Sequence, residues 1–211
     1  MKKIVSIIFL LFFVSIAYSQ ISLDLLHNMQ KKIASIPSFR AEYDMDVSNQ
    51  NSSKEQYSGE FYFQESFIKI ENLEMLVFAD RDSKWLCDLV NEEIVIVPID
   101  SSNANFLDDP WLIYSDIDDS YKLNKRYTTK FLGGAKCGVI ELKPNNSSFK
   151  DVSIELFINI ETFLPAGVTY KASANEVTIL FSNYKEITLL PTEFFKPSDE
   201  LMRTFVITDL R

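Results

Sequence analysis

The strongest constraint on the fold is a strict alternation of apolar and charged residues between positions 39 and 47. Apolar side chains stand at every odd position of this stretch, and charged ones stand at 40, 42, 44 and 46. Successive side chains of a strand point to opposite faces, so the pattern predicts a half-buried strand. Similar stretches recur between short polar turns and predict one meandering antiparallel sheet of about eleven strands. The expected strands are residues 39–47, 57–63, 68–70, 75–79, 85–90, 94–99, 121–131, 137–142, 152–160, 167–172, 177–184 and 205–208.

A helix is expected before the sheet. Leu26, Met29 and Ile33 step by three or four residues and form one apolar stripe, and Pro37 ends the helix. Such a stripe must lie against another apolar surface.

A second helical segment is expected within residues 103–119. Phe106, Trp111 and Leu112 make this connection strongly apolar, and Pro110 suits a first helical position. We therefore expect an α+β, mainly β domain with helices at two or three places.

A long sheet with few helices tends to curl, which hides its edges, and the amphipathic helices would then plug its concave face. The chain has 17 Phe and 9 Tyr residues but only 5 Gly. These aromatic residues either fill a solid core, which the pattern alone favours, or line a pocket for an apolar ligand. The candidate cavity residues are Tyr43, Met45, Phe61, Phe63, Ile70, Met75, Val77, Trp85 and Ile96. The candidate lid residues are Leu26, Met29, Ile33, Phe106, Trp111 and Leu112.

The N-terminus has the pattern of a secretion signal. Lys2 and Lys3 precede an uncharged apolar run over residues 4–17, and Ala17-Tyr18-Ser19 predicts cleavage before Gln20. We expect residues 20–211 to form a single exported domain in a bacterial periplasm. Its acidic balance, with a net charge of −9 for the whole chain, argues against binding to nucleic acid or to anionic membranes.

Few residues in the chain suit catalysis. His27 is the only histidine, so a Ser-His or Cys-His pair could be built only around it, and conventional zinc sites need more His and Cys than the chain has. The acidic residues from Asp108 to Asp119 lack the glycine and closing Glu of a calcium-binding loop, and a solvated loop is favoured. We expect no enzyme activity, no metal and no cofactor.

The two cysteines, Cys87 and Cys137, leave two alternatives open. An oxidising compartment would permit a disulfide between them. Separate, half-buried thiols are favoured because spacing along the chain does not bring the two together.

Several segments, taken in order, resemble the periplasmic lipoprotein-carrier family of LolA and its receptor relative LolB. The resemblance covers nearly all of residues 20–211. It is carried by the opening helix with Ile36-Pro37-Ser38-Phe39, and by six later segments: Gly59–Phe63, Asp82–Leu86, Asp109–Leu112, Val139–Pro144, Ile158–Ile160 with Leu164-Pro165, and Val206–Arg211. The Arg that the best-known carriers have just after the second strand is replaced here by Gln64-Glu65-Ser66.

The resemblance implies an incomplete, about eleven-stranded β-barrel with an α-helical lid over a hydrophobic cavity. The implied ligands are lipoprotein acyl chains, received from an inner-membrane ABC transporter and passed to an outer-membrane acceptor. A monomer is expected. The alternative is a sensor or scaffold of the same fold that reads lipid or protein partners without shuttling them.

Overall fold

The structure, a computed structural model, describes residues 22–49, 54–99, 117, 121–123, 128–145, 152–172 and 175–211. Most of these residues belong to one sheet of thirteen strands. The first six strands are β1 (Ser38–Asn49), β2 (Glu55–Gln64), β3 (Phe67–Glu71), β4 (Met75–Ala79), β5 (Ser83–Asp88) and β6 (Glu93–Pro98). The others are β7 (Tyr121–Leu123), β8 (Thr128–Leu132), β9 (Ala135–Pro144), β10 (Val152–Asn159), β11 (Pro165–Ala172), β12 (Asn175–Glu186) and β13 (Val206–Asp209).

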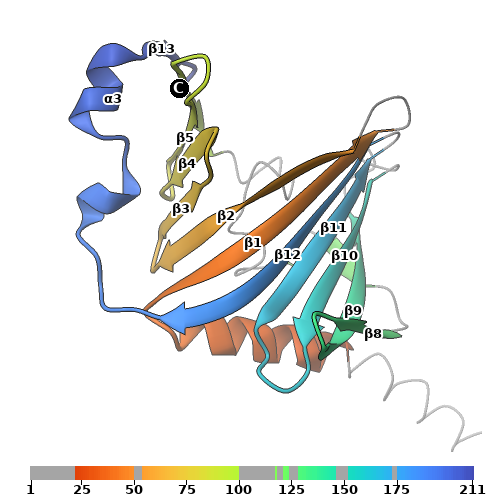
Figure 1. The fold of residues 1–211 in the computed structure, drawn as a ribbon. Coiled ribbons are helices and arrows are strands. Elements are labelled where there is room, and N and C mark those ends of the chain that lie inside the picture. The colour runs from red at the N-terminus through yellow and green to blue at the C-terminus, as the bar shows by residue number, and fades with distance from the viewer. Residues whose placement is uncertain are drawn as a thin grey trace, which may run out of the picture.

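The sheet consists of two antiparallel meanders joined edge to edge. One contains β1 to β6 and the other β9 to β12, and the pairing of β1 with β12 connects them. β13 lies at one edge and β7 with β8 at the other, so the curled sheet stays open (Figure 1). The mainly β, incompletely closed architecture expected from the sequence is confirmed.

Two details of the expected sheet are wrong. The stretch 121–131 is not one strand, because β7 and β8 are separate strands that both pair with β9. The last strand does not continue an antiparallel meander, because β13 pairs with β6 in parallel. The reason is that the chain crosses the sheet after β12 and reaches β6 running in the same direction.

The helix of residues 22–34 covers one end of the concave face of the sheet (Figure 1). We call concave the face that carries Phe39 and Tyr43, and outer the opposite face. Leu26, Met29 and Ile33 are 0 %, 0 % and 2 % exposed and pack in one core with that face. Burying three such side chains contributes roughly 5–9 kcal/mol of gross apolar transfer free energy, so the stripe fixes the helix to the sheet.

The C-terminal arm, residues 187–211, runs across the outer face of the sheet. Gln64 fixes its start, since its Nε2 donates to the Leu190 carbonyl at 2.9 Å and its Oε1 accepts from the Leu190 amide at 2.7 Å. Phe195 follows in a 3₁₀ turn, η4 (Thr192–Phe195), and is fully buried against Phe67 with ring centroids 5.7 Å apart. Gln64 therefore anchors the arm.

A short helix, α3 (Asp199–Thr204), then covers the outer face of β4 to β6. This helix was not expected from the sequence, although its start carries two helix signals. Ser198 is an N-cap whose hydroxyl accepts from the Leu201 amide, and Asp199 and Glu200 follow in the first turn. Beneath it lies an outer cluster of Phe78, Cys87, Ile94 and Ile96, flanked by Leu76, Trp85, Leu201, Met202 and Phe205.

The expected signal, residues 1–19, and the lid candidates Phe106, Trp111 and Leu112 lie outside the described residues. Of the segment 103–119, only Ile117 is described, and it is buried in the concave core.

If the arm holds the outer face, replacing its buried anchor should cost much of the stability of the domain. We expect Phe195→Ala to lower the free energy of unfolding by about 3–5 kcal/mol, because it removes a fully buried ring. Phe131→Ala is the matched control, since Phe131 is 75 % exposed. Urea unfolding of both variants measures the difference, and equal midpoints would show that the arm does not hold the sheet.

Candidate functional site

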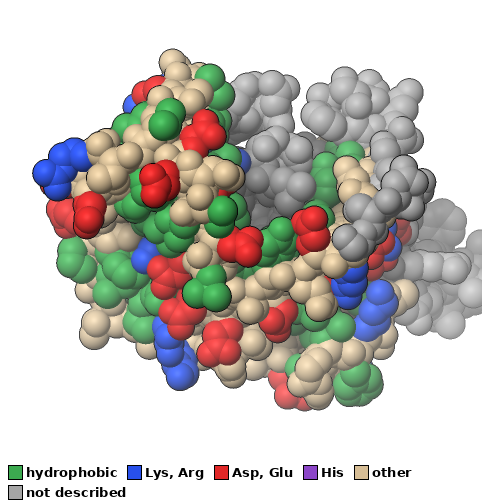
Figure 2. Space-filling model, turned by 45° about the horizontal axis from the view of Figure 1, so that its top comes forward, with side chains coloured by type: hydrophobic (Ala, Val, Ile, Leu, Met, Phe, Trp, Pro, Cys, Tyr) green, Lys and Arg blue, Asp and Glu red, His purple; other side chains and the backbone are tan. Residues whose placement is uncertain are grey.

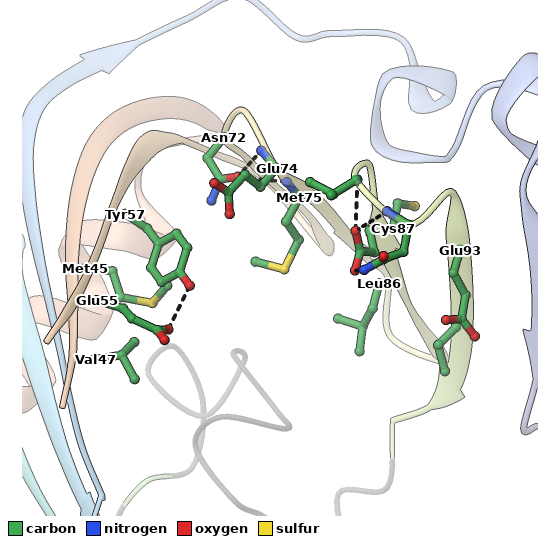
Figure 3. Close-up of a pocket in the computed structure, with 14 residues that line it drawn as sticks. Met45, Val47, Glu55, Tyr57, Asn72, Glu74, Met75, Leu86, Cys87 and Glu93 are labelled. Atoms are coloured by element: carbon green, nitrogen blue, oxygen red, sulfur yellow. Dashed lines mark hydrogen bonds between the residues drawn. The ribbon is translucent and has the colours of Figure 1, made fainter. Parts of the chain in front are cut away.

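The concave face is closed at one end and hollow at the other. The hollow is a pocket of about 590 Å³ beyond the reach of the helix, at the end of β1 and the start of β2 (Figure 3). That volume lies within the range of about 300–1,000 Å³ found for small-molecule sites. Its lining residues are Met45, Val47, Glu55, Tyr57, Asn72, Glu74, Met75, Leu86, Cys87, Asp88, Val90, Asn91, Glu93 and Val95.

The strand register explains the apolar floor. Met45 of β1 lies opposite Tyr57 of β2, and Leu86 of β5 lies opposite Val95 of β6. Because paired residues share a face, these side chains and Met75 of β4 all point into the hollow, as Figure 3 shows for the labelled ones. The floor is therefore built from five strands.

Tyr43 separates the pocket from the closed core. Its ring stands beside Gly59, where a Cβ would lie 1.9 Å from the Glu71 carbonyl oxygen, so only glycine allows this close approach of β2 and β3. Burial raises the pKa of the Tyr43 phenol, which stays neutral and accepts a hydrogen bond from Asn72 Nδ2 at 3.1 Å. Asn72 belongs to the pocket and Tyr43 to the core, so this bond lies at the boundary.

Two tight turns fix the rim. Asn72 Oδ1 accepts from the Glu74 and Met75 amides, both at 2.8 Å. Asp88 Oδ1 accepts from the Val90 and Asn91 amides, both at 2.9 Å. These Asx turns hold the β3–β4 and β5–β6 connections, and the Leu89 amide bonds the Glu74 carbonyl at 2.8 Å to join them.

The rim is acidic. Glu55, Glu74, Asp88 and Glu93 line the pocket, and no Lys, Arg or His of the described residues does. In Figure 2, acidic side chains in red lie beside the green hydrophobic floor of the hollow. Hydrogen bonds from Asn91 and Val90 lower the pKa of Asp88, so it stays ionised. Tyr57 donates to Glu55 at 2.9 Å, and this bond raises the pKa of Tyr57.

Seven of the nine candidate cavity residues lie on the concave face, and they divide between its two ends. Met45 and Met75 line the pocket. Tyr43, Phe61 and Phe63 are buried in the closed core, Ile70 packs against that core, and Val77 lies opposite Ile70 in the sheet. The lid candidates Leu26, Met29 and Ile33 lie in the same core. Whether these residues touch a ligand stays a prediction.

Trp85 and Ile96 do not lie on the concave face. They are opposite each other on the outer face, in the cluster beneath α3. α3 covers this face of β5, where Cys87 is fully buried and Trp85 partly buried, whereas Leu86 on the opposite face lines the pocket. The sequence pattern did not indicate a helix over the outer face, so Trp85 and Ile96 were assigned to the concave face. For the same reason Leu86 and Val95 were missed.

The pocket holds little that could react with a ligand. Within the described residues there is no group of three or more His, Cys, Asp and Glu that could hold a metal ion. Cys87 is part of the wall, but its side chain is fully buried in the outer cluster, and burial raises the pKa of its thiol to about 11. Cys87 and Cys137 are both free, as favoured from the sequence. Apolar floor and charged rim suit binding of an amphiphile.

Comparisons with known proteins show similarity of fold. No family model and no curated protein matches the chain. An uncharacterised conserved protein from Thermus thermophilus is similar with a TM-score of 0.56 and 8 % identity, over 89 % of this chain and 98 % of that one. MucB is similar with a TM-score of 0.51 and 13 % identity, over 90 % of this chain and 66 % of MucB.

The solved structures similar to this chain also include a LolA superfamily protein from Nitrosomonas europaea. Its TM-score is 0.45 at 10 % identity, over 83 % of this chain and 97 % of that one. The likeness is one of fold. In the part of the chain that the structure describes, no helix is both long and apolar enough to cross a membrane.

The state of the cysteines gives a direct test of the pocket wall. A raised thiol pKa keeps the reactive thiolate scarce, so at pH 8 we expect neither Cys87 nor Cys137 of the folded protein to react with iodoacetamide within minutes. After unfolding in urea without reductant, mass spectrometry should find two alkyl groups. A single fast-reacting thiol before unfolding would contradict the burial, and no alkylation afterwards would indicate a disulfide.

Proposed function

We propose that this protein is a periplasmic carrier that binds the acyl chains of lipoproteins and carries them from the inner to the outer membrane. The observation that carries the proposal is the open apolar pocket on the concave face, whose floor consists of Met45, Tyr57, Met75, Leu86 and Val95. The expected export signal at residues 1–19 and the fold resemblance to lipoprotein carriers support it. The proposed partners are an inner-membrane ABC release transporter and an outer-membrane acceptor.

The helix of residues 22–34 gives such a carrier a way to release its cargo. Burial of an acyl chain gains about 0.8 kcal/mol per methylene. Without an opposing free-energy cost, a bound acyl chain would therefore dissociate too slowly for delivery. A chain longer than the pocket must displace Met29 and its neighbours from the core, which costs part of that gain. Return of the helix then favours release. In this proposal the helix acts as the lid.

A pocket variant with a matched surface control tests the binding site. We expect Met75→Asp to weaken binding of a palmitoylated fluorescent peptide at least tenfold, because it puts a charge in the apolar floor. Leu189→Asp introduces the same charge at a residue that is 62 % exposed outside the pocket, and should leave binding unchanged. Fluorescence anisotropy measures both affinities.

A second variant tests the same pocket in case Met75→Asp does not fold. Leu86→Trp should narrow the hollow without adding a charge, and is expected to weaken binding of the same peptide while the thermal midpoint stays within a few degrees. Wild-type affinity in both pocket variants would overturn the proposed site.

Delivery separates the carrier from the non-shuttling alternative. We expect the loaded protein to transfer a lipoprotein to outer-membrane vesicles, and to keep it in the presence of inner-membrane vesicles. Tight binding without transfer would leave a sensor or scaffold as the function, and would contradict the carrier.

A further inference from the structure

The charge of the pocket mouth narrows the kind of ligand that the proposed carrier accepts. The four carboxylates of the rim come from three separate places: the start of β2, the β3–β4 turn, and the β5–β6 connection with its flanking residues. This inference rests on the proposed function, because it concerns the same pocket.

Lys54, the basic residue next to Glu55 in the sequence, does not neutralise this rim. Lys54 directly precedes Glu55, but its Nζ pairs with Asp46 Oδ2 at 2.9 Å. Gln56 also bonds Asp46, with Nε2 2.7 Å from Oδ1. Asp46 alternates with Met45 along β1, so this group lies on the outer face, away from the hollow. Within the described residues, the carboxylates of the rim are therefore not paired with Lys54 or with any basic residue of the pocket lining.

The hydrogen bonds of the acidic side chains leave their charges in place. Asp88 accepts from Asn91 and Val90, and Glu55 accepts from Tyr57, all of which are neutral donors. Glu93 Oε1 is 3.4 Å from the hydroxyl of Thr208, also neutral. Neutral donors favour the ionised carboxylate without cancelling its charge.

We propose that the pocket selects acylated peptides with Lys or Arg next to the acyl chain. The acyl chain occupies the apolar floor, and the basic residues lie among the carboxylates of the rim. Because the carboxylates are spread over three segments, they suit several charges along a peptide better than the single charge of one head group. Amphiphiles with acidic groups at the same place are repelled.

The rim also offers exposed apolar contacts, one of them in the pocket lining (Val90) and one outside it (Leu73). Leu73 is 96 % exposed at the tip of the β3–β4 turn, and Val90 is 69 % exposed in the β5–β6 connection. In the sequence, Leu73 directly precedes Glu74, and Val90 follows two residues after Asp88. A peptide leaving the pocket meets carboxylates and aliphatic side chains together, which suits a basic chain with apolar residues among its charges.

Three palmitoylated fluorescent hexapeptides test the charge preference. They differ only in the two residues after the acylated position, which are Lys, Gln or Glu, and each is used below the concentration at which it aggregates. We expect affinity to fall in the order Lys, Gln, Glu, with a Lys-to-Glu ratio on the order of tenfold in 50 mM NaCl. In 500 mM NaCl the ratio should fall to roughly twofold, because salt screens exposed charges.

A charge-neutralised rim provides the matching variant. Glu74→Gln/Glu93→Gln should reduce the Lys-to-Glu ratio to about threefold at low salt and leave the affinity of the Gln peptide unchanged. Glu65→Gln/Glu161→Gln is the control: it makes the same change of net charge at exposed turns that do not line the pocket, and should keep the wild-type ratio.

The outcomes separate the two proposals. Binding of all three peptides with equal affinity, or with a preference that the control pair removes as well as the rim pair, overturns the charge selection and leaves the acyl-chain site intact. No binding of any peptide overturns the proposed function itself.

Discussion

A sheet with apolar residues on both faces needs two covers, and this requirement governs the structure. The concave face is covered at one end by the stripe of Leu26, Met29 and Ile33. The outer face of β4 to β6 is covered by α3, which the C-terminal arm brings across from β12. Among the described residues, the part of the concave face around Met45, Met75 and Leu86 has neither cover, and the pocket lies there.

The sequence predicted the helices and strands better than it predicted which of them pack together. Alternation from Phe39 to Val47 identified β1, and the spacing of Leu26, Met29 and Ile33 identified the helix and its buried side. The same local pattern does not reveal which other element packs on each face of a strand. Ile96 is buried and Trp85 is partly buried, as their types suggest, but by a six-residue helix more than a hundred residues later in the chain.

Most of the pocket lining, including Tyr57, Leu86 and Val95 of the floor, escaped the sequence for a similar reason. Leu86 and Val95 are ordinary aliphatic residues, and only the register of β4, β5 and β6 places them beside Met75. The acidic rim comes from turns whose carboxylates look like solvated surface when taken one at a time. Gln64 is a further case, because nothing in the sequence indicated that its side chain would hold Leu190 through two hydrogen bonds.

In the proposed carrier, the two ends of the concave face work together in a binding cycle. An acyl chain would enter the pocket without moving the helix, and would reach the further apolar surface of the closed core only by displacing the helix. Tyr43 and Asn72 lie at the boundary, where a chain that advances from the pocket first meets the core. This division ties affinity to a conformational cost, which a carrier needs in order to release its cargo.

The methionines permit one direct test of this account. Met45 and Met75 line the pocket, Met29 lies on the buried side of the helix, and Met202 lies on α3 at the outer face. In the mature protein labelled with ¹³C-methyl methionine, an acyl chain with a nitroxide at its end should broaden the NMR signals of Met45 and Met75. The signal of Met29 should shift only with long chains, and Met202 should not change. Broadening of Met202 with no effect on Met45 and Met75 would contradict an acyl-chain site on the concave face.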